Sequence, residues 1–171
     1  GGSYDHFRSH TVLRGSQSDF SYSLGLMRQN SGGYRDRVTS RGTTANLFGG
    51  WTPFQETELL FHYTDHQDVS GFAGGLTPAQ VEQNRKGAGA FPGFFDDELR
   101  FGSVQLIQEL DSNMTLVGDI GLHHRESDSV TTSRFASLTR GLEVGLRGSH
   151  EALGEDWTAT TLAGLDWLKD K

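Results

Sequence analysis

Cysteine is absent from the sequence, and proline is scarce, with only 3 residues. Without cysteine, neither a disulfide framework nor a thiolate metal site can form. The lack of thiols fits an oxidising envelope compartment. Hydrophobic residues make up 34% of the 171 residues, a low share for a globular domain, whereas glycine is abundant, with 23 residues. The length suits a single domain spanning residues 1–171, but the apolar content is small for one.

Long apolar runs and basic clusters are missing too. No apolar run reaches the roughly 18 residues that a transmembrane helix needs. The formal net charge of −7, without any Lys/Arg-rich run, argues against a nucleic-acid partner. The opening GGSYDHFRSH has neither the apolar region nor the cleavage pattern of a secretory signal. The chain is then expected to be mature, cytosolic or a part of something longer.

Motifs of the common enzyme classes are not found. There is no GxSxG elbow, no phosphate loop ending in Lys-Ser/Thr, and no spacing that singles out a catalytic triad or a glycosidase carboxylate pair. We therefore expect no enzymatic activity and no cofactor. The pairs His6/His10 and His62/His66 have a spacing that chelates metal on a helix, but on strands their rings lie about 13 Å apart, so no metal site is expected.

Alternating apolar and polar residues are the dominant feature that is present. In FSYSLGLMRQ, Phe20, Tyr22, Leu24 and Leu26 occupy every second position, which is typical of a strand with one apolar face. The pattern recurs and predicts an all-β fold of eight strands, several long enough to cross a bilayer. The predicted strands are Tyr4–Arg14, Asp19–Gln29, Val38–Trp51, Thr57–Asp68, Glu98–Leu110, Met114–Arg125, Arg134–Ser149 and Asp156–Lys169.

The predicted connections alternate between short and long. Short ones follow Arg14, Trp51 and Leu110, whereas Asn30–Arg37, residues 70–97 and Glu126–Ser133 are longer. Outer-membrane barrels show this alternation, with short periplasmic turns and longer extracellular loops. Within the longest connection, Leu76–Lys86 predicts a short helix, with Thr77 as its N-cap and Pro78 at the first helical position.

The two faces of the predicted strands differ in polarity. In Met114–Arg125, Ile120 and Leu122 share one face, whereas Asp119 and His123 share the other. Because charged groups gather on a common face, we interpret that face as the wall of a wide aqueous lumen, and the apolar face as turned toward lipid. An ordinary apolar core of a soluble sheet is the alternative.

Aromatic residues are expected at the two rims of the lipid-facing band. Trp157 and Trp167 share a face of the last predicted strand, about 25 Å apart along the membrane normal for a strand tilted by about 40°. Phe20, Trp51 and Phe54 lie next to short turns, where a periplasmic aromatic girdle would be.

Several segments resemble the barrel of TonB-dependent outer-membrane receptors. FSYSLGLMRQNSGGYRDR resembles that family's alternating strand with a DGYRDNS-like loop, and GFAGGLTPAQVEQNRKGAGAFPGFFDDELR resembles its long extracellular loop with a short helix. RFGSVQLIQELDSNMTLVGDIGLHHRES is similar to a family hairpin with a tight periplasmic turn. The resemblance covers most of the chain.

The departures from this family predict a fragment. No plug domain or TonB box is recognisable, the last residues Leu168 to Lys171 include no terminal aromatic, and eight strands are far fewer than the roughly 22 of such transporters. We therefore expect a segment of an antiparallel up-and-down transmembrane β-barrel, without plug or C-terminus.

The resemblance implies uptake of a nutrient such as a ferric siderophore across the bacterial outer membrane. The implied partners are the lipid bilayer, a small-molecule ligand, the missing strands and plug of the same receptor, and the inner-membrane TonB complex acting through that plug. Two other functions stay open. One is a complete small outer-membrane barrel with a structural or adhesive role, and the other is a soluble β-sandwich or lipocalin-like ligand binder.

Candidate ligand residues come from loops and from the predicted lumen wall. Arginine suits bidentate recognition of an anionic chelate, and aromatics exposed in a long loop suit ligand or partner contact. The acidic run Asp96, Asp97 and Glu98 is a weaker candidate for a cation. The loop candidates are Tyr34, Arg35, Arg37, Phe91, Phe94 and Phe95, and the lumen candidates are Glu58, His62, Asp119, His123, Glu143 and Arg147.

Overall fold

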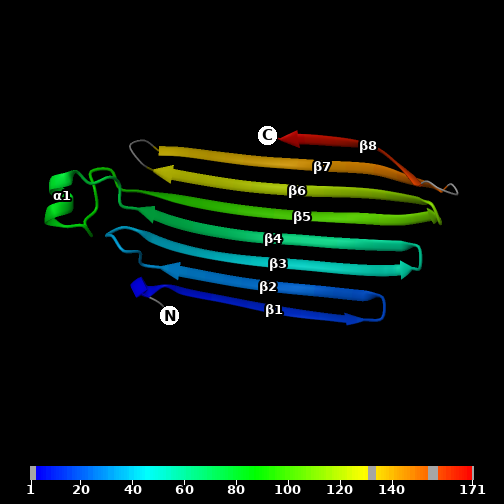
Figure 1. Cartoon of the computed structure of the whole chain (residues 1–171), viewed down its shortest axis with the longest axis horizontal. Helices are drawn as coiled ribbons and strands as arrows, with labels where there is room; N and C mark the ends of the chain where they lie inside the picture. Colours follow the sequence, from blue (N-terminus) through cyan, green and yellow to red (C-terminus); the bar gives the residue numbers. More distant parts are fainter. Residues whose placement is uncertain (1–2, 131–133, 154–157, 171) are drawn as a thin grey trace.

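The structure, a computed structural model, describes residues 3–130, 134–153 and 158–170, with the backbone alone for 3, 150–153, 158–166 and 168–170. The described chain forms one antiparallel sheet of eight strands in the order β1 to β8, with one short helix (Figure 1). The strands are β1 (Phe7–Gln17), β2 (Phe20–Ser31), β3 (Thr39–Phe54), β4 (Thr57–Phe72), β5 (Gly93–Asp111), β6 (Met114–Val130), β7 (Arg134–Leu153) and β8 (Thr158–Asp170), and the helix is α1 (Pro78–Gln83).

The sheet is open. Among the described residues, β1 contacts no other strand than β2, and β8 contacts no other strand than β7. The prediction of an all-β, up-and-down arrangement is therefore confirmed, whereas the alternative of a small barrel closed by these strands alone is wrong.

The strand boundaries differ from the predicted ones mainly at the end of the sheet near α1. Strand β1 begins at Phe7, because Ser3–Asp5 forms a 3-10 turn in which Tyr4 adopts a φ of 62°. The connection predicted at residues 70–97 is shorter, since β4 runs to Phe72 and β5 starts at Gly93. Likewise, most of the predicted loop Glu126–Ser133 belongs to β6, which ends at Val130.

Helix α1 is shorter than predicted but begins as the sequence indicates. The backbone N–H of Thr77 donates to Oε1 of Gln80, and the Gln80 backbone N–H donates to the Thr77 hydroxyl oxygen. This capping box and Pro78 in the first turn fix the start of the helix. No helix in the described part of the chain is long and apolar enough to cross a membrane.

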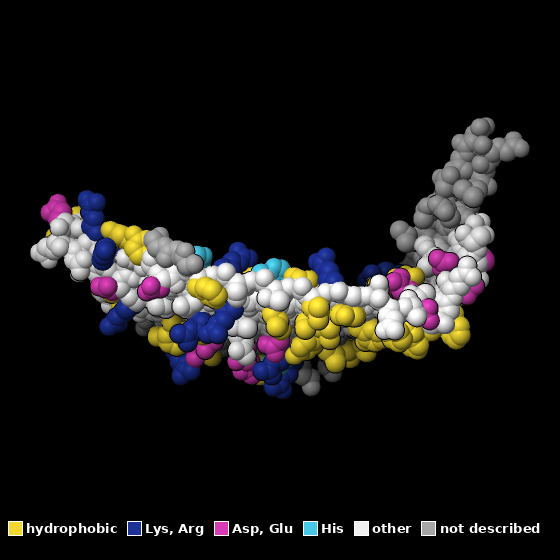
Figure 2. Space-filling model, turned by 90° about the horizontal axis from the view of Figure 1, so that it is seen from below, with side chains coloured by type: hydrophobic (Ala, Val, Ile, Leu, Met, Phe, Trp, Pro, Cys, Tyr) yellow, Lys and Arg dark blue, Asp and Glu magenta, His cyan; other side chains and the backbone are white. Residues whose placement is uncertain are grey.

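The strand registers align apolar side chains in rows across one face. Figure 2 shows a bowed sheet with hydrophobic side chains gathered on its convex face, over the half away from α1. We call these residues the convex belt. Its three rows are Leu13, Leu24, Leu47, Tyr63, Leu122 and Leu142; Tyr22, Phe61, Val104, Ile120, Val144 and Trp167; and Phe20, Trp51, Leu59, Leu106 and Leu146.

No protein core lies beneath the convex belt. Leu24, Ile120 and Val144 are 36%, 46% and 39% exposed, and within the described residues Ala73 is the only buried hydrophobic side chain. The described strands all belong to the one sheet, so no second sheet covers either face. The two-layer core expected of a soluble sandwich is thus not found in the described part of the chain.

Candidate ligand-binding face

The opposite, concave face carries the polar residues of the alternating strands. Two adjacent rows cross its centre from β2 to β7. One row contains Ser23, Phe48, His62, Ser103, Gly121 and Glu143, and the next contains Ser21, Gly50, Leu60, Gln105, Asp119 and Gly145. The small members of both rows leave the face hollow at this point, because glycine and serine fill little of the space above the sheet.

These rows line a hollow of about 550 Å³. Four of the six predicted lumen residues border it: His62, Asp119, Glu143 and Arg147. Glu58 lies on the same face, opposite Ile107 of β5, and His123 lies in the adjoining row, opposite Phe101. The structure therefore places all six predicted lumen residues on one face and brings four of them together around one hollow.

An aromatic cluster forms one side of the hollow. The rings of Phe48 and His62 stack with centroids 4.3 Å apart and an interplanar angle of 7°, and His62 contacts Phe101 at 5.3 Å. The Nε2 of His62 lies 2.9 Å from the Thr64 hydroxyl, and this hydrogen bond holds the His62 ring in its stacked orientation. The cluster offers a flat apolar surface on an otherwise polar face.

Acidic groups form the other side. Asp119 lies opposite Gly145, so its diagonal neighbours on β7 are Glu143 and Arg147. The Asp119 side chain is 18% exposed, and Nη2 of Arg147 is 3.9 Å from its Oδ1. That oxygen is buried and accepts no hydrogen bond. Among the described residues, Oδ1 therefore has no hydrogen-bond donor, and the surrounding atoms shield it from solvent.

Nearer α1, the concave face carries a tighter ion pair. Asp97 of β5 accepts hydrogen bonds of 2.8 and 3.2 Å from Nε and Nη2 of Arg125, and another from Ser127. The hydrogen bond from Arg125 lowers the pKa of Asp97, against an opposing effect of partial burial, and Ser127 lowers it further. Asp97 is therefore engaged within the sheet, whereas Asp96 and Glu98 lie on the convex face.

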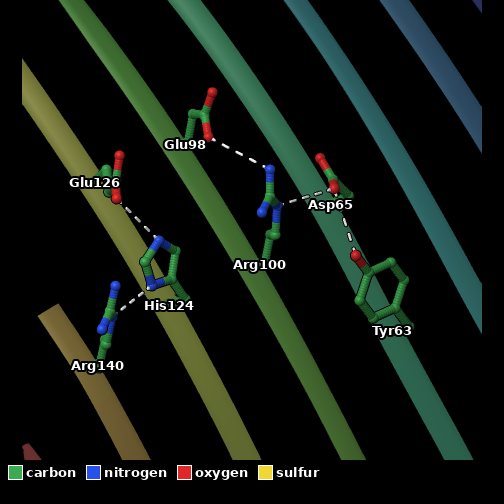
Figure 3. A network of polar contacts seen from close by, with 7 residues as sticks. All are labelled: Tyr63, Asp65, Glu98, Arg100, His124, Glu126 and Arg140. Carbon is green, nitrogen blue, oxygen red and sulfur yellow. Dashed lines mark hydrogen bonds and ion pairs between the residues drawn. The ribbon is translucent and has the colours of Figure 1, made fainter. Parts of the chain in front are cut away.

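A charged network borders the convex belt on the side of α1 (Figure 3). Nε of Arg100 lies 3.4 Å from Asp65, to which the Tyr63 hydroxyl also donates at 3.4 Å. One strand further, Nε of Arg140 donates to Nδ1 of His124 at 3.1 Å, and Nε2 of His124 lies 3.3 Å from Glu126. The same face therefore changes from apolar to charged at Tyr63.

The predicted basic loop binds its neighbouring loop. Nε and Nη2 of Arg35 donate to the Gly87 carbonyl at 3.2 and 3.0 Å, and the Asp36 amide donates to the Lys86 carbonyl at 2.6 Å. Nζ of Lys86 lies 5.7 Å from the centre of the Tyr34 ring. Arg35 is thus engaged in fixing residues 32–38 to the β4–β5 connection, rather than directed at open solvent.

The three predicted aromatic residues of the long connection do not form one patch. Phe91 lies in the connection and is 62% exposed. Phe94 and Phe95 belong to β5 instead, where they point to opposite faces; Phe95 contacts Phe72 at 5.4 Å on the concave face. The prediction that Phe94 and Phe95 lie in a loop is therefore wrong, because β4 and β5 pair further than the sequence indicates.

Other predicted residues give limited results. Arg37 lies in the β2–β3 connection with a φ of 66°. Trp157 falls outside the described residues, whereas Trp167 is 51% exposed on β8. In the described part of the chain, no three His, Asp or Glu side chains converge as metal ligands. Phe48, Phe101 and Gly145 were not predicted, although alternation along β3 and β5 places both aromatics on the polar face.

No known protein family matches this chain, and no curated protein is similar to it in sequence.

Proposed function

We propose that this chain forms part of the barrel wall of an outer-membrane receptor that takes up a scarce nutrient, such as a ferric siderophore. The carrying observation is the convex belt: an apolar band across β1 to β8 over which the described residues form no second layer. Such a band is unfavourable in water and favourable in hydrocarbon. Long antiparallel strands and short turns at one end suit the same setting.

The change from apolar to charged residues along the strands, and the difference in polarity between the two faces, support a sheet that crosses a bilayer. Tyr63 stands at the boundary between the convex belt and the network of Asp65 and Arg100, as expected of an aromatic residue at a membrane interface. The concave face, with its charged residues, suits a water-filled lumen, because a barrel interior of this kind stays polar. The stacked rings of Phe20 and Trp51 lie near the opposite, short-turn edge.

The receptor role rests on the resemblance to TonB-dependent receptors and on the polar concave face. In this role the remaining strands and a plug come from the same receptor, and the inner-membrane TonB complex supplies energy through that plug. The chain's own residues bind and pass the ligand without covalent chemistry.

The absence of cysteine makes a direct test of membrane orientation straightforward. Single-cysteine variants at neighbouring positions, Leu24→Cys with Ser23→Cys and Val144→Cys with Glu143→Cys, carry an environment-sensitive fluorophore after reconstitution into phospholipid vesicles. We expect quenching by brominated lipids only at Leu24 and Val144, and quenching by a water-soluble agent only at Ser23 and Glu143. Equal water access at both members of each pair would refute the bilayer setting.

Receptor function requires a separate measurement. Bacteria producing the full-length protein are expected to accumulate radiolabelled iron from a ferric siderophore, and to lose this uptake when the TonB complex is deleted. Uptake that is independent of the TonB complex, or no uptake of any chelate tested, would refute the receptor role and leave a structural or adhesive role for a barrel that includes further strands.

A further inference from the structure

We propose that the concave hollow binds an organic cation that carries a flat aromatic ring. This inference rests on the proposed function only in requiring that the concave face is open to water. It assigns to the hollow a ligand class that the resemblance does not supply, and it follows from the placement of one aromatic cluster and one carboxylate.

The ring site follows from Gly121. A Cβ at this position would lie 3.6 Å from Cε2 of Phe101 and 3.9 Å from Cβ of Glu143. The space over Gly121 is thus flanked by an aromatic ring on β5 and a carboxylate-bearing side chain on β7. A planar ring placed there stacks against the apolar side while its edge reaches the acidic side.

The charge preference follows from Asp119. Its side chain is 18% exposed, its shielded Oδ1 accepts no hydrogen bond among the described residues, and Nη2 of Arg147 lies 3.9 Å from that oxygen. Among the described charged side chains bordering the hollow, Asp119 and Glu143 are negative and Arg147 is positive, so this described lining carries a net charge of −1. A ligand with a positively charged N–H group offsets this negative charge, and its N–H can donate to the exposed side chain of Glu143 beside Asp119.

An anionic ligand fits this hollow less well. Arg147 is its only bordering cation among the described residues, and Asp119 already lies beside it. An anion at this place would face two carboxylates that lie diagonally across β6 and β7. Specificity for cations over anions therefore comes from repulsion as well as attraction.

The test compares three probes that share the naphthalene ring system but differ in charge: the cation 1-naphthylmethylamine, the neutral 1-naphthylmethanol and the anion 1-naphthylacetate. Binding to the full chain in phosphatidylcholine vesicles is measured by equilibrium dialysis, with protein-free vesicles giving the background. We expect the amine to bind about tenfold or more tightly than the alcohol, and the acetate to bind most weakly.

Variants then separate the two parts of the site. Asp119→Asn keeps the shape and is expected to remove the preference for the amine over the alcohol. Phe101→Leu is expected to weaken all three probes together. Asp65→Asn, on the convex face, is the matched control and should change none of them. Circular dichroism of each variant verifies that the strands are retained.

Three results would overturn the inference: no binding of any probe, equal binding of amine and alcohol, or an unchanged preference in Asp119→Asn. These results are independent of the fluorophore test of the bilayer setting. Selective amine binding with a water-exposed convex belt would refute the membrane proposal and leave the cation site standing. A lipid-facing belt without selective amine binding would refute the cation site and leave the membrane proposal standing.

Discussion

Asp119 and Gly145 face each other across β6 and β7, and the carboxylate covers the glycine so closely that an added Cβ would lie 2.7 Å from both its oxygens. The contact explains why this position lacks a side chain. It also ties the orientation of the acidic group in the hollow to the backbone of the next strand.

Replacing Gly145 therefore has a defined consequence. We expect Gly145→Ala to push the Asp119 carboxylate away, and this displacement to offset the gain of up to about 1 kcal/mol that alanine otherwise brings over glycine in a strand. Gly148 is a matched control in the same strand, because an added Cβ there meets no described atom within 4 Å. Gly148→Ala should be neutral or stabilising by up to about 1 kcal/mol. Urea unfolding of both variants measures the difference, and equal stabilities would contradict the contact.

A charge placed on the convex belt should be costly in a bilayer. For a chain reconstituted into phospholipid vesicles, we expect Leu24→Arg to reduce the free energy of unfolding by about 2–4 kcal/mol, the cost of arginine on a lipid-facing barrel surface. The neighbouring Ser23→Arg places the same charge in the concave hollow and should cost far less. If the two variants were equally stable, the belt would not face hydrocarbon.

The contact between the two connections near α1 should control access to the longer one. Arg35→Ala removes two hydrogen bonds to the Gly87 carbonyl. A loss of about 1 kcal/mol corresponds to a roughly fivefold larger open population. We therefore expect trypsin to cleave after Arg85 and Lys86 about five times faster in this variant. Arg41→Ala, on β3, is the control, and equal cleavage rates would show that Arg35 does not fix the connection.

The ion pair of Asp97 and Arg125 should make stability depend on pH in the acidic range. Because the hydrogen bond from Arg125 lowers the pKa of Asp97 in the folded state, its contribution is complete above the unfolded value, near 3.8. The contribution is lost as the pH falls through the lowered folded value. Arg125→Gln should thus be less stable than the original chain at neutral pH and equally stable in strong acid. Parallel stability curves at all pH values would contradict this role.

Much of the fold could be predicted from the sequence because the period of two is so regular. In β2, the alternation of Leu24 and Leu26 with Ser23 and Gly25 fixes both the strand and its faces. The ends of β4, β5 and β6 were less predictable. There, polar residues such as Asp128 pair across strands, and Asp128 forms an ion pair with Arg134 across β6 and β7, where composition alone indicates a loop.

The sequence predicts on which face of the sheet each candidate site residue lies, but not which of these residues lie next to one another. Alternation within each strand places Asp119 and Glu143 on the polar side. Their proximity to each other, to Arg147 and to Phe101 depends on the registers of β5, β6 and β7, which single strands do not encode. The aromatic stack was missed for the same reason, since Phe48 and His62 meet only once β3 and β4 are aligned.

The strictly sequential strand order has a further consequence for how such a wall can evolve. Since each strand, as far as the structure describes it, contacts only its neighbours along the chain, a whole hairpin can be gained or lost elsewhere without disturbing any register described above. The acidic side of the hollow needs only β6 and β7, and its aromatic side needs only β3 to β5. The number of strands and the chemistry of the hollow can therefore vary separately: duplication of hairpins changes the width of the sheet, while point substitutions within five strands change the lining of the hollow.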